Sequence, residues 1–204
     1  MQQKVRWKRV RELLESIKAV VDEIYKADPD TWQATSMVLF PPADKQRIKG
    51  FFSDPPVQGI PETYAEFLLA SDGMDEGWGR MDFFGTDRSR WKKLRDRIEL
   101  LARTVRGNVN YQIGDPNDSN IREWETKRNS LYPGFHPVVG VSSQAGTIVY
   151  DSRSRDKTGR MDLCDWVLGD GIRARYANLQ AYFEACLRDA ETYRSKNVRK
   201  KKRR

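Results

Sequence analysis

The chain has 204 residues and a mass of 23.7 kDa, which suits one domain with at most a small appendage. Its formal net charge is +8, from 37 basic and 29 acidic residues, so an acidic or polyanionic partner is expected only where the positive charge is concentrated. No run of about 18 apolar residues occurs and no apolar segment follows the basic N-terminal residues, so we expect a cytoplasmic protein without a membrane span.

Five segments show the spacing of amphipathic helices, with apolar residues at steps of three and four. Pro61 suits the first turn of one of them, and Gly73 is predicted to be its left-handed C-terminal cap. Asn178 is predicted to cap the last helix at its N-terminus. The predicted helices cover residues 4–26, 43–52, 61–72, 88–106 and 179–190.

The strand signals are fewer and lie mostly late in the chain. A short strand is predicted through Met81 and Phe83, and residues 138–141 and 147–150 are predicted to form a hairpin. Residues 161–171 indicate a further strand or a turn, and the polar segment 107–135 is predicted to be a long connection with one or two helical turns. This order favours an α+β fold, in which helices pack on an antiparallel or mixed sheet, in a single domain.

The last eleven residues, 194–204, differ from the rest in composition. They contain eight Lys or Arg, no acidic residue and one apolar residue, so we predict a disordered basic tail after a domain of residues 1–193. Without these eight cations, 29 basic residues balance the 29 acidic ones, and the domain has a formal net charge of zero. The cations at the end of the tail are Arg199, Lys200, Lys201, Lys202, Arg203 and Arg204.

The motifs that carry enzyme chemistry are missing from the sequence. No phosphate-binding glycine loop, nucleophile elbow or HExxH helix occurs. His136 is the only histidine and lies in a Pro-flanked stretch, so we expect no chemical role for it. Cys164 and Cys186 lack CxxC spacing and are predicted to be reduced thiols. We therefore predict no enzymatic activity, no cofactor and no metal.

Two charged segments are candidate partner-binding surfaces. Residues 72–82 place four carboxylates around Trp78, and an aromatic residue among charges is typical of a binding hot spot; a solvated turn is the alternative. The predicted helix 88–106 carries an excess of cations, which indicates either a solvated face or a surface for an acidic partner. The candidate residues are Asp72, Asp75, Glu76, Trp78, Arg88, Arg90, Lys92 and Lys93.

Residues 40–73 contain a recognisable order of motifs: a proline-led short helix, an Ile-Pro pair, a helix with Tyr and Phe-Leu, and an Asp-Gly end. The residues that carry it are Ile48, Ile60, Pro61, Tyr64, Phe67, Leu68, Asp72 and Gly73. This order resembles the SUKH superfamily, which includes the Smi/Knr-type killer-toxin-resistance proteins and many bacterial immunity proteins. The hairpin that ends at Asp151 and the helix after Asn178 also resemble that family, so the likeness touches about two thirds of the chain.

The resemblance implies a non-enzymatic α+β protein that binds another protein. In bacteria that partner would be a polymorphic toxin, which the immunity protein of such a toxin–antitoxin pair neutralises by covering its active site. Two alternatives to this interpretation stay open. The first is a nucleic-acid-associated protein that makes weak nonspecific contacts through the tail and the helix 88–106. The second is a regulatory scaffold of the yeast cell-wall type.

Overall fold

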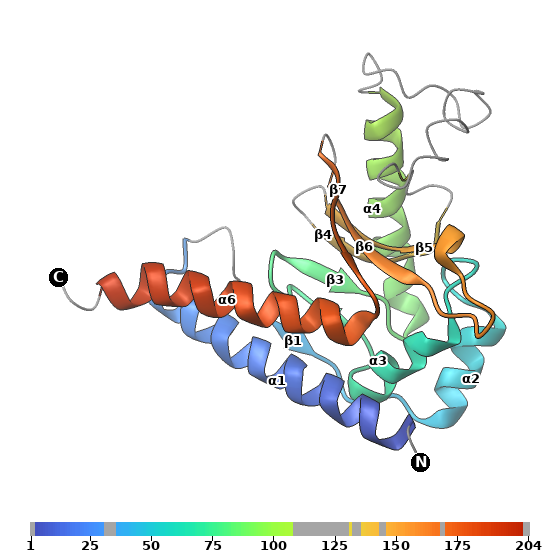
Figure 1. Ribbon diagram of the computed structural model, residues 1–204, viewed down its shortest axis with the longest axis horizontal. Coiled ribbons are helices and arrows are strands. Elements are labelled where there is room, and N and C mark those ends of the chain that lie inside the picture. Colours follow the sequence, from blue (N-terminus) through green and yellow to red (C-terminus); the bar gives the residue numbers. More distant parts are fainter. Residues whose placement is uncertain are drawn as a thin grey trace.

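In the computed structural model the chain folds into a seven-stranded antiparallel sheet with five α-helices among the described residues (Figure 1). The structure describes residues 3–30, 36–107, 131, 136–142, 146–167 and 170–201. The predicted α+β fold class is confirmed, and the sheet is antiparallel throughout. The predicted connection 107–135 lies almost entirely outside the described residues.

The sheet is a meander in which each strand pairs with the next one along the chain, so the spatial order is β1 to β7. The longest ladders join β4 to β5, β5 to β6 and β6 to β7, and two of these three contain a register shift. The strands are β1 (Val38–Leu39), β2 (Met74–Asp75), β3 (Met81–Phe83), β4 (Val138–Ser142), β5 (Gly146–Asp151), β6 (Asp162–Val167) and β7 (Gly171–Tyr176).

The helices lie on both faces of the sheet. The two long terminal helices run side by side in the same direction on one face, and α4 stands against the other (Figure 1). The helices are α1 (Gln3–Ala27), α2 (Lys45–Ser53), α3 (Ala65–Ala70), α4 (Arg88–Gly107) and α6 (Leu179–Lys201), with short 3₁₀ turns η1 (Glu62–Tyr64) and η3 (Ser152–Ser154).

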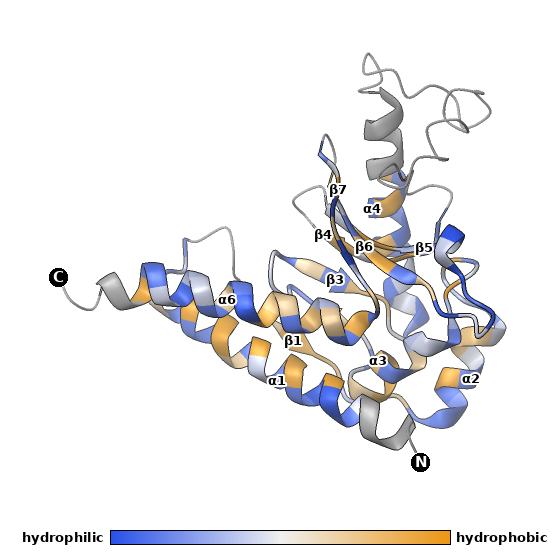
Figure 2. Ribbon diagram, viewed as in Figure 1, coloured by the Kyte–Doolittle hydropathy of each residue, from blue (hydrophilic) through white to orange (hydrophobic). Residues whose placement is uncertain are grey.

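Alternation along the strands divides the core into two parts. In β6, Leu163 packs with the side chains of α1, α3 and α6, whereas Cys164 and Trp166 pack on the α4 face with Ile98. This is the period of two expected of a sheet covered on both faces. Along α1, hydrophobic and hydrophilic residues alternate as on a helix with one buried face (Figure 2).

The helix expected over residues 61–72 is shorter and less regular than its sequence indicates. It begins as the 3₁₀ turn η1, continues as α3 and ends at Ala70, and Ser71 after it is extended. Gly73 has a φ of +98°, so it does take a left-handed conformation, but it lies beyond the position of a helix cap. Asn178 does cap α6, because its Oδ1 accepts from the backbone N–H of Ala181 at 2.9 Å.

The prediction that the chain is disordered from residue 194 is wrong for residues 194–201, which continue α6 to Lys201. The reason is packing against α1. Val198, the tail's one apolar residue, is 2% exposed in the core, and Arg194 Nη1 lies 3.0 Å from Glu23 Oε2. Residues 202–204 lie outside the described residues.

Candidate functional site

A groove of about 630 Å³ lies between α6 and the sheet. One wall comes from residues 182–197 of α6, and the other from strands β3 to β7 and the turn between β2 and β3. Of the candidate partner-binding residues, Trp78 alone lines it. The aromatic and charged lining residues include Trp78, Asp165, Arg173, Tyr176, Asp189 and Tyr193.

Trp78 is held in the groove by an unusually shaped turn. Glu76 and Arg80 have φ values of +54° and +56°, a left-handed conformation that side chains rarely adopt, and Gly79 between them has +71°. Ser142 on β4 donates its hydroxyl to the Gly79 carbonyl at 2.8 Å and ties the turn to the sheet. Strained residues of this kind persist where the surroundings fix them, and they cluster at functional sites.

Aromatic side chains line both walls of the groove. Trp78 meets Tyr193 of α6 edge to face at 5.7 Å between ring centroids, and Tyr176 of β7 meets Tyr182 at 5.4 Å. Burial raises the pKa of Tyr176 to about 12 and that of the Cys186 thiol to about 12. Both groups are therefore protonated near neutral pH, and Cys186 behaves as a small apolar lining residue rather than as a nucleophile.

The groove lies beside an edge of the sheet. Within the described part of the chain, β7 pairs with β6 and with no other strand, so one side of its backbone has no strand partner. Tyr176 and Arg173 of the same strand line the groove. An extended peptide can add to such an edge by backbone hydrogen bonds while its side chains enter the neighbouring groove.

The acidic segment 72–82 and the basic helix α4 are paired with each other. Arg90 forms an ion pair with Asp75, and Arg97 forms one with Asp82, whose side chain is 1% exposed. Lys93 lies 3.9 Å from the same Asp82 carboxylate. Burial raises the pKa of Asp82, although the Glu76 backbone N–H and these cations oppose the shift. Two of the four carboxylates of the segment, Asp75 and Asp82, therefore hold α4 to the sheet.

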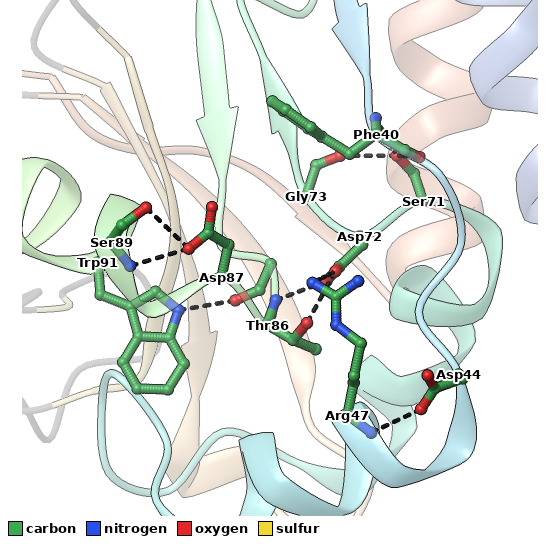
Figure 3. A network of polar contacts seen from close by, with 11 residues as sticks. Phe40, Asp44, Arg47, Ser71, Asp72, Gly73, Thr86, Asp87, Ser89 and Trp91 are labelled. Carbon is green, nitrogen blue, oxygen red and sulfur yellow. Dashed lines mark hydrogen bonds and ion pairs between the residues drawn. The ribbon is translucent and has the colours of Figure 1, made fainter.

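Asp72 is also a structural residue rather than an exposed partner contact. Its carboxylate accepts from the Thr86 backbone N–H at 2.5 Å and the Thr86 hydroxyl at 2.7 Å, and Arg47 Nη2 lies 2.6 Å away (Figure 3). The loops approach so closely that a Cβ on Gly85 would lie 2.1 Å from the Asp72 carbonyl oxygen. With a side chain 4% exposed, Asp72 joins α2, α3 and the loop before α4.

The remaining candidates on α4 also have neighbours within the protein. Arg88 lies 3.0 Å from Asp54 and stands over the Trp91 ring, and Lys92 lies 2.6 Å from Asp96. None of them lines the groove. Of the tail candidates, Arg199, Lys200 and Lys201 belong to α6, and Lys202, Arg203 and Arg204 lie outside the described residues.

His136 has a local structural role. Its Nδ1 lies 2.8 Å from the Ser152 hydroxyl and accepts from the Ser152 backbone N–H at 3.2 Å. These contacts hold the turn η3 to the segment before β4. Cys164 and Cys186 are both free thiols, as predicted.

Among the described residues, no group of three or more His, Cys, Asp or Glu could hold a metal ion. No described helix combines the length and the apolar character that crossing a membrane needs.

Comparisons of the chain with models of protein families and with curated proteins find no match. The resemblance to the SUKH superfamily stays a prediction.

Sequence reasoning missed most of the groove. Asp165, Tyr176 and Tyr193 come from β6, β7 and α6, and only the strand register and the path of α6 bring them together. The segment 171–176 carries one weak signal, the alternation of Ile172, Ala174 and Tyr176 with two arginines, which is typical of a strand.

Proposed function

We propose that the chain is a non-enzymatic protein-binding module, and that it acts as an immunity protein that binds and neutralises a toxin. The observation that carries the proposal is the aromatic groove beside the edge strand β7. Tyr and Trp are the residues most enriched in binding hot spots, and three of the groove's aromatic residues are only partly buried by the protein itself.

The charge distribution supports a protein partner over a polyanion. Five cations of α4 lie next to carboxylates of the same chain: Arg88 beside Asp54, Arg90 beside Asp75, Lys92 beside Asp96, and Lys93 and Arg97 beside Asp82. Polyanion binding gains its affinity by releasing counterions from phosphates through cations that are available to it. Cations with carboxylate neighbours contribute less to such binding than isolated cations do, and the net charge of +8 comes from residues 194–204 rather than from α4.

The test is a complex with the protein encoded beside this gene. Co-expression should rescue cells from that protein's toxicity, and the purified proteins should form a complex in calorimetry. Trp78→Ala and Tyr193→Ala should each weaken the complex about tenfold, because each removes a large aromatic surface from the groove. Tyr25→Ala, on an exposed part of α1 outside the groove, is the matched control and should bind as the parent does.

The proposal fails if no complex forms and no rescue occurs. If Tyr25→Ala and Trp78→Ala weaken a complex equally, the groove is not the binding site. Circular dichroism of each variant confirms that the fold is intact before binding is compared.

A further inference from the structure

Asp165 differs from the buried carboxylates elsewhere in the protein. Asp72, Asp82 and Asp151 all have cations within ion-pair distance. Asp165 lines the groove, is half-buried, and makes no hydrogen bond or ion pair with the described residues. A half-buried carboxylate that forms no ion pair within the fold can gain one from a bound positively charged group, so this position is open to such a group.

Charged and titratable groups from two elements face this carboxyl. Arg173 on the neighbouring strand β7 and Lys196 on α6 are both exposed at the rim, and Asp189 on α6 is an exposed rim acid. Burial raises the pKa of Asp165, Arg173 lowers it, and Asp189 raises it. The hydroxyls of Tyr176 and Tyr182 and the thiol of Cys186 stay neutral near pH 7 and add no charge.

The chemistry inside the groove discriminates between three kinds of ligand group. Arg173, Lys196 and Asp189 place charges of both signs at the rim, but an anion deeper in the groove would meet the negative charge of Asp165. An apolar group would cover Asp165 and leave its charge buried without a partner. A guanidinium or ammonium group would pair with Asp165 while its alkyl stem contacts the ring of Tyr176, which lies near Asp165 in the groove.

We propose that Asp165 anchors an arginine or lysine side chain of the bound protein inside the groove. This inference rests on the proposed function, because it names the chemistry of the segment that the module recognises. Arg173 and Lys196 are exposed, and neither forms an ion pair with Asp165 among the described residues. The bound segment therefore presents one basic side chain inward, next to the edge strand β7.

The experiment uses the full chain and two blocked peptides, acetyl-Gly-Arg-Gly-amide and acetyl-Gly-Gln-Gly-amide, which differ only in the cationic group. Nuclear magnetic resonance follows the Asp165 carboxyl carbon and the backbone amides of β6, β7 and α6. The arginine peptide should shift the groove resonances and lower the pKa of Asp165, and the glutamine peptide should do neither. Asp165→Asn should weaken arginine-peptide binding about fivefold, as expected for loss of one charge-assisted hydrogen bond at a half-buried site.

Two controls keep the result interpretable. Asp96→Asn removes an exposed carboxylate on α4, outside the groove, and should leave peptide binding unchanged. Asp165→Asn removes a charge without an ion-pair partner, so its urea midpoint should equal or exceed that of the parent. Equal shifts with both peptides, or unchanged binding in Asp165→Asn, would overturn the inference. A toxin complex that tolerates Asp165→Asn would also overturn it while leaving the proposed function intact, whereas peptide binding without any toxin complex would overturn only the proposed function.

Discussion

The carboxylate of Asp151 makes a quantitative prediction about the pH dependence of stability. It lies at the end of β5, where its side chain is 4% exposed. Arg153 Nε lies 2.7 Å from its Oδ1, and Arg175 Nη2 on β7 lies 2.8 Å from its Oδ2. Asp151 therefore ties the edge strand β7, which forms part of the groove, to the middle of the sheet.

These contacts set the pKa of Asp151. Burial alone would raise it, but the hydrogen bonds from Arg153 and Arg175 outweigh burial and lower the pKa from 3.8 to about 2. A carboxyl whose pKa is lower in the folded state stabilises the fold above its unfolded pKa. A shift of this size corresponds to about 2 kcal/mol at neutral pH. This stabilisation is lost as the pH falls from about 4 toward 2.

The variant Asp151→Asn keeps the shape and one acceptor but removes the charge. Its free energy of unfolding should be about 2 kcal/mol below that of the parent at pH 7, and the difference should shrink as the pH approaches 2. Urea denaturation followed by tryptophan fluorescence at pH 7, 5, 4 and 3 measures this. Asp96→Asn, at an exposed i,i+4 pair with Lys92, is the matched control and should change stability by less than about 0.5 kcal/mol.

Two results would refute this reasoning. A difference between parent and Asp151→Asn that stays constant from pH 7 to pH 3 would mean that the lost charge is not its origin. A difference no larger than that of Asp96→Asn would mean that the arginine contacts do not stabilise the folded state.

Three further substitutions have effects that urea denaturation can measure. Val198→Ala should destabilise the protein by about 1–2 kcal/mol, because it removes two buried methyl groups from a helix segment that a disordered tail would not contain; an unchanged midpoint would contradict this. Arg97→Met should lower stability by about 3 kcal/mol by leaving Asp82 buried without its nearest cation, and adding Asp82→Asn should restore at least half of the loss. Gly85→Ala should destabilise by more than about 2 kcal/mol through its backbone clash, whereas Gly50→Ala, which has open space in α2, should stabilise by about 0.5–1 kcal/mol; similar effects at both positions would contradict the assigned geometry.

Elements that begin at a capping residue or surround a short turn could be predicted from the sequence. Asp44 begins α2 by accepting from the Arg47 backbone N–H at 2.8 Å, and Asn178 begins α6 in the same way. The hairpin of β4 and β5 follows from two apolar runs around a short loop. Each of these signals lies within a few residues of the structure that it specifies, so a single sequence is sufficient to read it.

The elements that were missed depend on partners far away in the chain. The two arginines of β7 weaken the signal of a buried strand, and Arg175 is accommodated because it lies beside Asp151 across the sheet. The tail looked disordered because one apolar residue cannot form a core, yet Val198 has only to fill a position beside α1. The composition of a segment shows how much apolar surface it could bury on its own. These two segments are ordered instead by contacts with distant parts of the chain, which composition does not show.

The same distinction changes what the charge of the protein means for recognition. The balance of 29 basic and 29 acidic residues in 1–193 could describe either separate charged surfaces or internal pairs. Carboxylates of segment 72–82 form ion pairs with cations of α4, and these ion pairs hold α4 to the sheet. In the proposed function, recognition then depends on charged groups that form no ion pair within the described fold. Asp165 is such a group in the groove, and a neutral domain can therefore still select a basic side chain at one position.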